Sequence, residues 1–414
     1  MNEELKNQVL SAREAARELR TCASGQKDRA LRAMAQALKD RRGEILDANE
    51  QDLAQGRKRG LNSALLDRLS LSDSRIEELA SGLEELANLP DPVGEVERMW
   101  KRPNGLEIGV KRVPLGVVAM IYEARPNVTA DAAGLCLKAG NAAVLRGGSE
   151  AIHSNSAIGN VLTDAIAQAG LPGTAVSVIR NTDRNLVREL IRMRELVDVV
   201  IPRGGAGLIR TVVEEATVPV IETGVGNCHT YVDKAADLQM ALRIAINAKL
   251  QRPGVCNAME TLLVHQDVAA AFLPALGAEM AQKVELRGCP RTCQLIPQAK
   301  PATEDDWATE YLDYILAVRV VPSFEEAVAH ITRYSTGHSE AIVTEDYTAA
   351  RRFLELIDAA AVYVNASTRF TDGGQFGLGA EIGISTQKLH ARGPMGLKAL
   401  TTTKYIIYGN GQIR

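Results

Sequence analysis

The residue best suited to covalent chemistry is Cys256, at the centre of the segment 251–260, QRPGVCNAME. This segment follows an amphipathic pattern at 238–250 and precedes an apolar run at 261–264, so we expect a turn between a helix and a strand. The Pro-Gly pair at 253–254 ends the helix and lets backbone approach a ligand closely. A thiolate on such a turn can attack an activated carbonyl while its backbone N–H faces the developing oxyanion. Because a free cysteine is more often a small buried hydrophobe, this interpretation depends on the rest of the chain.

The other cysteines and the histidines do not form a metal or disulfide pattern. The cysteines stand at 22, 136, 228, 256, 289 and 293, too few and too scattered for a disulfide framework. Cys289 and Cys293 form a C-x3-C pair without a second pair to complete a tetrahedral site, and we expect a polar surface loop there. The histidines show no i, i+4 pairing. We therefore predict no metal.

Composition and charge exclude several classes of protein. The chain has 414 residues, of which 46% are hydrophobic and 24% charged, as in a globular protein of two or three domains. A net charge of −3 gives no electrostatic reason to expect nucleic acid or an anionic membrane as partner. No apolar run approaches the ~18 residues of a membrane span, and the N-terminus lacks the apolar core of a signal peptide. We expect a cytoplasmic protein.

The first part of the chain has helical periodicity, and a hairpin follows it. Residues 1–90 carry apolar stripes typical of amphipathic helices, one of them opened by a capping box from Ser74 to Glu77. Asn-Gly at 104–105, between two alternating runs, predicts a β-hairpin over 95–116. The β-prone tail at 397–409 has no other partner, so we pair it with this hairpin in a subunit interface.

From residue 116 the chain alternates between short apolar strands and helices. Near-continuous apolar, β-branched strands are typical of a parallel sheet covered on both faces. The pattern predicts a doubly wound sheet, whose ligand site lies at the carboxyl ends of the strands. The expected strands are Val117–Tyr122, Ala142–Arg146, Ala175–Ile179, Val197–Ile201 and Val218–Glu222, and the expected helices include Asn127–Ala139 and Asn155–Gln168.

Two of these strand ends suggest a nucleotide site. Arg146, with the small residues Gly147 and Ser149, stands where a cofactor ribose would lie. The segment RGGAG at 203–207 precedes a helix whose N-terminal N–H groups would face a pyrophosphate. Its glycine spacing differs from the GxGxxG fingerprint, and glycine turns between strand and helix are common without a ligand.

A second α/β region begins near residue 227. A glycine-rich run over 366–387 follows its last strand and is typical of loops over a site. The expected strands are His229–Val232, Glu260–Val264, Ile315–Val321, Ala341–Val343 and Ala361–Asn365, and the expected helices include Leu238–Leu250 and Phe324–Thr332.

Several segments together resemble a known family. Those at 112–118, 137–148, 218–228 and 251–256 resemble the aldehyde dehydrogenase superfamily, and those at 122–132, 201–209 and 367–397 are similar to its γ-glutamyl phosphate reductase branch. The resemblance implies an α/β protein of two doubly wound domains with a small β-hairpin oligomerisation element. The implied parts are an NADPH-binding domain over 1–96 and 115–226, with 376–394 returning to it, a catalytic domain over 227–375, and an oligomerisation element over 97–114 and 395–414.

The resemblance also implies roles for single residues. Cys256 matches the catalytic thiol, and Asn127 matches the asparagine whose side-chain amide completes the oxyanion hole. Arg146 matches the position at which members of the family bind the adenosine ribose, and an arginine suits the 2′-phosphate of NADPH. Glu222 matches a glutamate that activates water in hydrolytic members, a step that a reductase of acyl phosphates does not need. The other implied cofactor positions are Gly204, Gly205 and Gly207 near the pyrophosphate and Glu310 at the nicotinamide ribose.

The implied reaction is NADPH-dependent reduction of L-glutamyl 5-phosphate to L-glutamate 5-semialdehyde in proline biosynthesis, through a thioester on Cys256 and with release of phosphate. Such a substrate needs cations for its anionic groups. Arg369 is the first candidate, with Ser367 and Thr368 as hydroxyl donors, and Lys388 and His390 are weaker ones.

Three alternatives stay open at this point. An acyl-CoA reductase or a non-phosphorylating aldehyde dehydrogenase would use the same thiol, and release of CoA or use of water would distinguish them from a phosphate-releasing enzyme. A nucleotide-binding module with a dead site is the third, and the joint presence of Cys256 and Asn127 argues against it. As partners we expect a second copy of the chain, in a dimer or tetramer, and transient contact with the glutamate 5-kinase that supplies the labile acyl phosphate.

Overall fold

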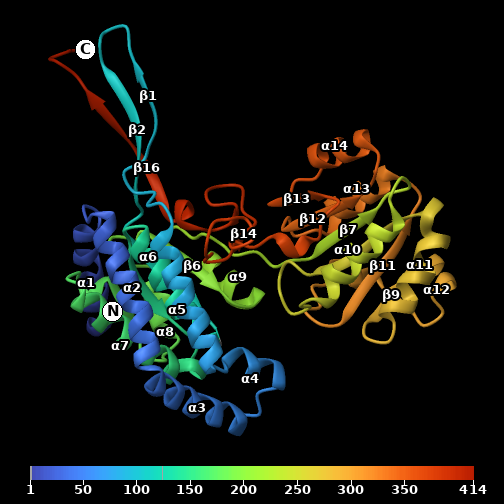
Figure 1. Cartoon of the computed structure of the whole chain (residues 1–414), viewed down its shortest axis with the longest axis horizontal. Helices are drawn as coiled ribbons and strands as arrows, with labels where there is room; N and C mark the ends of the chain where they lie inside the picture. Colours follow the sequence, from blue (N-terminus) through green and yellow to red (C-terminus); the bar gives the residue numbers. More distant parts are fainter. Residues whose placement is uncertain (1, 124) are drawn as a thin grey trace. The chain divides into compact units, whose positions relative to one another are not determined.

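The computed structural model describes residues 2–123 and 125–414, which form two compact units (Figure 1). The first unit comprises Met1–Thr223, Gly377–Gly383 and Met395–Arg414, and the second comprises Gly224–Phe376 and Ile384–Pro394. Ala124, part of the family-like segment 122–132, lies outside the described residues. No helix of the described chain is long and apolar enough to cross a membrane.

Amphipathic helices open the first unit, as their apolar stripes predict. Leu31, Met34 and Leu38 are fully buried on one face of the second helix. The N-cap of the fifth helix lies two residues earlier than predicted, because Ser72, not Ser74, accepts the hydrogen bond from the N–H of Arg75. These helices are α1 (Glu3–Leu19), α2 (Ser24–Asp40), α3 (Arg42–Lys58), α4 (Ser63–Leu69) and α5 (Asp73–Asn88).

A four-stranded parallel sheet forms the core of the first unit, in the order β5-β4-β3-β6. The predicted strand Val218–Glu222 is wrong. Pro219 has no N–H to donate, and only an isolated bridge joins Val220 to Val200. The elements are β3 (Val117–Tyr122), α6 (Asn127–Lys138), β4 (Ala142–Arg146), η1 (Ser149–Ala151), α7 (Ile152–Gln168), η2 (Gly173–Ala175), β5 (Val176–Val178), α8 (Asn185–Leu190), β6 (Val199–Arg203) and α9 (Ala206–Glu215).

The second unit contains a seven-stranded parallel sheet in the order β10-β9-β11-β8-β7-β12-β13. The five predicted strands are present, and the short, charged strands β9 and β10 at one end of the sheet were not predicted. The C-x3-C pair is not a loop, since Cys289 precedes α12 and Cys293 lies within it. The elements are β7 (Cys228–Val232), α10 (Leu238–Leu250), β8 (Met259–His265), α11 (Gln266–Met280), β9 (Glu285–Gly288), α12 (Pro290–Leu295), β10 (Lys300–Pro301), η3 (Glu304–Ala308), β11 (Ile315–Val321), α13 (Phe324–Tyr334), β12 (Ser339–Val343), α14 (Tyr347–Leu356), β13 (Ala361–Val364) and η4 (Thr368–Phe370).

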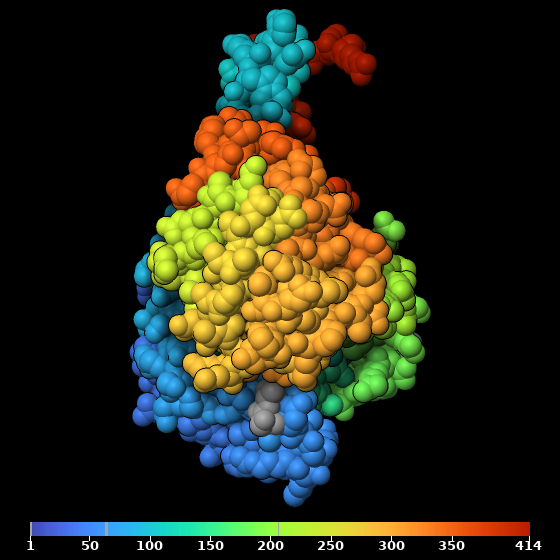
Figure 2. Space-filling model, turned by 90° about the vertical axis from the view of Figure 1, so that its right-hand side faces the viewer, coloured from blue at the N-terminus to red at the C-terminus, as the bar shows by residue number. Residues whose placement is uncertain are grey.

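The predicted hairpin is present and pairs with the C-terminal strand. The strands β1 (Val96–Lys101), β2 (Glu107–Pro114) and β16 (Thr401–Tyr408) form an antiparallel sheet with β2 in the middle. The hairpin projects away from the helices of its own unit (Figures 1 and 2). The short 3-10 turn η5 (Leu397–Leu400) precedes β16.

The unit boundaries differ from the implied domains over 376–394. Residues 377–383 lie with the first unit, but 384–394 lie with the second. Within the second unit, β14 (Ile384–Ser385) pairs with β15 (Gly393–Pro394), and the carbonyl of Ile384 accepts a hydrogen bond from Gly224 N. Backbone pairing therefore places this part of the glycine-rich run.

Candidate active site

Cys256 lies on the turn that joins α10 to β8, as predicted. The helix ends at Leu250 because Pro253 cannot continue it, and β8 begins at Met259. The residue is partly exposed and is not in a disulfide. The turn lies at the amino end of β8, a central strand, and the carbonyl of Cys256 contacts Cys228 at the start of the neighbouring strand β7. The turn therefore presents a reachable thiol on a rigid support.

Arg369, the predicted substrate cation, contacts both sides of this turn. Its Nε donates a hydrogen bond of 2.7 Å to Oε1 of Gln251, and its Nη1 donates to Oδ1 of Asn257. Burial and the nearby charge of Arg252 lower the pKa of its guanidinium, and the charge of the Cys256 thiolate opposes that shift. Arg369 thus lies against the turn that carries Cys256, and its role as a substrate ligand stays a prediction.

The two hydroxyl groups predicted beside Arg369 have other partners. Thr368 is fully buried and its Oγ1 donates to the carbonyl of Asn257 at 2.8 Å. Ser367 is also buried, and its Oγ accepts a hydrogen bond from Arg369 N at 3.3 Å. Since the Thr368 proton is already donated, the structure gives this residue a role in holding the turn instead of the predicted substrate contact.

The weaker cation candidates lie on the exposed segment near β14. Lys388 forms an ion pair with Asp358, which also pairs with Arg392 at 2.7 Å. Its ammonium therefore already has a carboxylate partner within the second unit, which it shares with Arg392. His390 is exposed and its carbonyl accepts a hydrogen bond from Gln387 Nε2 at 2.8 Å.

Gly226 brings Glu310 and the carbonyl of Cys256 close together. A Cβ on Gly226 would lie 1.5 Å from the carbonyl oxygen of Cys256, so only glycine fits at this position. The N–H of Gly226 donates a 2.7 Å hydrogen bond to Oε1 of Glu310. Glu310, predicted at the nicotinamide ribose, is thus hydrogen-bonded to the residue that touches the nucleophile turn.

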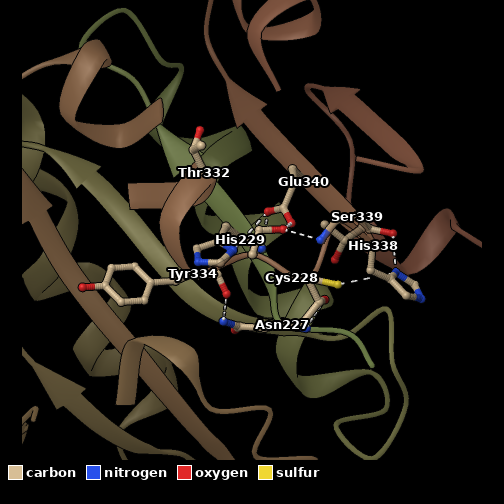
Figure 3. Close-up of polar contacts among 12 residues, drawn as sticks. Asn227, Cys228, His229, Thr332, Tyr334, His338, Ser339 and Glu340 are labelled. Atoms are coloured by element: carbon tan, nitrogen blue, oxygen red, sulfur yellow. Dashed lines mark hydrogen bonds and ion pairs between the residues drawn. The ribbon is translucent and has the colours of Figure 1, made fainter. Parts of the chain in front are cut away.

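Buried polar residues behind the turn were not predicted as part of the site. Cys228 donates its S–H to the carbonyl of Cys256 at 3.1 Å and lies 3.7 Å from Nδ1 of His338 (Figure 3). Ser339 and Thr371 continue these contacts toward Asn257. Their contacts join residues up to 114 positions apart in the chain, so no local sequence pattern predicts them.

In the first unit, Arg146 lies at the carboxyl end of β4 as predicted. It is buried, its Nη2 donates to the carbonyl of Thr182 at 2.9 Å, and its Nη1 donates to the carbonyl of Gly147. Burial lowers the pKa of its guanidinium, and the charge of Glu150 raises it. Ser149 opens η1 directly after this strand end.

The glycine turn at 204–207 joins β6 to α9, also as predicted. Gly205 is the N-cap residue of α9, and its N–H donates to Oε2 of Glu123 at 2.8 Å. A Cβ on Gly204 would lie 2.5 Å from the same carboxylate oxygen, whereas one on Gly207 would meet nothing within 4 Å. A carboxylate of the chain therefore lies against the N-terminus where we predicted a pyrophosphate, which agrees with the preference of such a terminus for anions.

Asn127 and Glu222 also belong to the first unit. Asn127 is the first residue of α6, and its Nδ2 donates to Oδ2 of Asp131 at 3.2 Å. Glu222 lies in the irregular segment after β6 and α9. The role of Asn127 in an oxyanion hole stays a prediction, and so does any role of Glu222. Among the residues the structure describes, no group of three or more His, Cys, Asp or Glu could hold a metal ion.

Comparison with known proteins identifies relatives along the whole chain. Residues 1–306 match the Aldehyde dehydrogenase family. The gamma-glutamyl phosphate reductase of Moorella thermoacetica is 66% identical over 404 residues, 97% of each chain. The crystal structure of gamma-glutamyl phosphate reductase from Thermotoga maritima is 53% identical, with a TM-score of 0.97 over 99% of this chain and 100% of that one. A yeast structure of the same description, from Saccharomyces cerevisiae, is 31% identical over 99% of this chain and 98% of that one, with a TM-score of 0.55.

Proposed function

Because this chain belongs to the aldehyde dehydrogenase family and, within it, to the gamma-glutamyl phosphate reductases, we propose that it reduces L-glutamyl 5-phosphate to L-glutamate 5-semialdehyde in proline biosynthesis. The observation that carries this proposal is the pairing of two features in one place. A partly exposed thiol stands on the turn after α10, and the guanidinium of Arg369 is hydrogen-bonded to both sides of that turn. An acyl phosphate needs a nucleophile and a cation at the same site.

Cys256 is the proposed nucleophile. Its thiolate attacks the γ-carbonyl of the acyl phosphate, and the C–O bond to phosphate breaks. Inorganic phosphate departs, and the acyl group remains on the sulfur as a thioester. When bound, a nicotinamide cofactor would supply the hydride that reduces the thioester carbonyl. The resulting hemithioacetal collapses to the aldehyde and restores the thiol. An oxyanion develops on the same carbonyl oxygen before and after the thioester, so one set of N–H donors serves both steps. The backbone N–H of Cys256 and the side-chain amide of Asn127 are the proposed donors.

Arg369 is the proposed ligand for an anionic group of the substrate. Its contacts with Gln251 and Asn257 fix the plane of the guanidinium, which lowers the entropy lost when a phosphate or carboxylate binds. Arg252, exposed on the same turn, adds a second positive charge. Ser367 is buried, and its Oγ supports Arg369 by accepting a hydrogen bond from the backbone N–H of Arg369.

As a member of its family the protein uses a nicotinamide cofactor, and we propose NADPH. The buried guanidinium of Arg146 at the end of β4 supports a site for the 2′-phosphate, with Gly147 and Ser149 beside it. The N-terminus of α9, with Gly204, Gly205 and Gly207, supports a pyrophosphate site because it already attracts the carboxylate of Glu123. Glu310 is the proposed ligand of the nicotinamide ribose.

The reverse reaction tests the proposed chemistry. Purified protein would receive glutamate 5-semialdehyde, which exists with its cyclic form, and NADP⁺, with and without phosphate. We expect NADPH formation that requires phosphate and is abolished in Cys256→Ala, because the thiol must form the thioester that phosphate attacks. Cys136→Ala, which removes a buried thiol of the first unit, is the matched control and should retain activity.

Each other outcome would favour a different function. NADPH formation without phosphate would indicate a hydrolytic aldehyde dehydrogenase, and Glu222 would then be the candidate base. Absence of turnover with every co-substrate would indicate a nucleotide-binding protein. The homo-oligomer, the contact with glutamate 5-kinase and the cytoplasmic location stay predictions.

A further inference from the structure

Five buried side chains form a closed chain of contacts behind Cys256, which we call the polar ring: Cys228, His338, Ser339, Thr371 and Asn257. All are at most 5% exposed. Cys228 opens β7 and Ser339 opens β12, and these two strands are neighbours in the sheet (Figure 3). The ring therefore lies where two central strands begin.

The contacts of the ring run from the backbone carbonyl of Cys256 to the side chain of the next residue, Asn257. The ring starts at the carbonyl oxygen of Cys256, which accepts the S–H of Cys228 at 3.1 Å. Cys228 lies 3.7 Å from His338 Nδ1, which is 2.8 Å from Ser339 Oγ, and Ser339 Oγ is 2.7 Å from Thr371 Oγ1. The ring closes where the carbonyl of Thr371 accepts Asn257 Nδ2 at 2.8 Å. The contacts thus fix both the carbonyl of Cys256 and the side chain of the next residue.

Two further observations show that this carbonyl has little freedom. The carbonyl oxygen lies so close to Gly226 that a Cβ there would be 1.5 Å from it, so the carbonyl cannot turn further toward this residue. The thiol of Cys228 stays protonated and able to donate, because burial and the charges of Glu340 and Cys256 hold its pKa well above its usual value. The carbonyl of Cys256 shares a rigid peptide plane with the N–H of Asn257, so a fixed carbonyl restrains ψ of Cys256 and with it the Cα from which the thiol projects.

We propose that Cys228 is a positioning residue for the nucleophile: its S–H, held within the polar ring, orients the Cys256 turn for thioester chemistry. The role builds on the proposed function, since Cys256 must first be the nucleophile. It differs from simple core packing because it depends on a hydrogen-bond donor at one atom. Serine, which has a donor but a shorter side chain, restores part of the contact, whereas alanine restores none.

The test compares Cys228→Ala, Cys228→Ser and Cys136→Ala in two measurements. The first is kcat and KM in the phosphate-dependent reverse assay. The second is the pH dependence of alkylation of Cys256 by iodoacetamide, followed by mass spectrometry of its peptide, which needs no turnover. For Cys228→Ala we expect kcat to fall about tenfold to a hundredfold with KM within about threefold, because a nucleophile displaced by a fraction of an ångström loses its alignment. We also expect the alkylation midpoint to move upward by about half a pH unit or more, since the thiolate loses aligned donors.

The two measurements distinguish a restored hydrogen-bond donor from a proposal that is wrong. Cys228→Ser should recover most of the alkylation profile and more than half of the lost kcat on a logarithmic scale, and Cys136→Ala should match the parent in both measurements. Wild-type kcat and alkylation in Cys228→Ala would overturn the proposal, and so would a serine variant no better than alanine. Should Cys228→Ala fail to melt cooperatively, the serine variant alone decides. If the parent shows no turnover, the proposed function fails while the alkylation profiles still test the positioning role.

Discussion

In the proposed site, Arg369 both holds the turn of Cys256 and binds an anionic group of the substrate. Its guanidinium holds Gln251 and Asn257 on either side of the thiol, and it carries the positive charge that an acyl phosphate requires. A lysine would keep the charge but has a single ammonium group in place of the planar fork. Replacing Arg369 with lysine therefore tests whether the site needs only the positive charge or also the planar geometry of the guanidinium.

Arg369→Lys should raise the KM for phosphate in the reverse reaction about tenfold to a hundredfold, the equivalent of roughly 1.5–3 kcal/mol for charge-assisted hydrogen bonds. Steady-state kinetics at varied phosphate and varied semialdehyde would measure this. Arg291→Lys, an exposed arginine of the same unit, is the control. A KM that rises only for the semialdehyde would instead assign Arg369 to the α-carboxylate.

His338 makes stability depend on pH, because burial lowers the pKa of its imidazole to about 4. The unfolded chain binds a proton at this histidine below about pH 6.5, whereas the folded chain does so only below about pH 4, so stability is lost as the pH falls between these values. The shift corresponds to about 3 kcal/mol for this residue. We expect urea midpoints measured from pH 7 to pH 4.5 to fall less steeply in His338→Gln than in the parent. Parallel curves for the two proteins would contradict this assignment.

At the scale of elements, the patterns of buried strands and amphipathic helices were sufficient to predict most of the two sheets. The strand Ile315–Val321 and the helix Leu238–Leu250 have the predicted bounds. Strand β9 was missed because Glu285–Gly288 is short and charged, and its pairing comes from the neighbouring β11. Site residues that are brought together only by strand pairing were missed for the same reason. Cys256 and Arg369 stand in informative local segments, but Cys228 meets His338 only through the pairing of distant strands.

A buried ion pair joins the two elements that carry the nucleophile turn. Lys249 near the end of α10 and Glu260 in β8 lie 2.5 Å apart and are both fully buried. Burial raises the pKa of the Glu260 carboxyl to about 7, and Lys249 opposes this rise. Glu260 Oε1 also accepts the N–H of Leu312 at 3.1 Å, two residues after Glu310. The pair therefore connects the turn of Cys256 with the segment that bears Glu310.

Glu260→Gln should destabilise the protein by about 3–5 kcal/mol, because it leaves the Lys249 ammonium buried without a counter-charge. The double variant Lys249→Met with Glu260→Gln removes that charge and keeps an acceptor for Leu312, so it should regain most of the loss. Urea unfolding would measure both. Glu325→Gln, which breaks an exposed pair with Arg352, is the control and should leave the urea midpoint nearly unchanged. A double variant no more stable than the single one would contradict the argument.

At the scale of the whole molecule, the proposed chemistry divides between two units that each contain their own sheet. The proposed pyrophosphate and adenosine contacts lie in the first unit, and the thiol with Arg369 lies in the second. The chain passes between the units at 223–224, 376–377, 383–384 and 394–395. Each unit is thus built from separate stretches of sequence, which explains why composition alone gave no boundary.

The sheet of β1, β2 and β16 exposes an apolar face that a second copy of the chain would cover. The strand register places Trp100, Ile108 and Ile407 side by side, with Tyr405 two residues along on the same face. Tyr405 and Ile407 are 64% and 59% exposed. Both β1 and β16 are edge strands, whose free backbone groups also favour pairing. These features support the predicted homo-oligomer.

Ile407→Asp should shift the protein from an oligomer toward the monomer, because a buried carboxylate without a partner costs several kcal/mol in an apolar contact. Light scattering coupled to size exclusion, at several protein concentrations, would measure the mass. Lys404→Asp, at a polar position of the same strand that faces the other side of the sheet, separates a change of charge from loss of the apolar contact. An unchanged mass for Ile407→Asp would place the interface elsewhere. A monomeric parent would show that this face is free, and its apolar area would then mark a contact with a different protein.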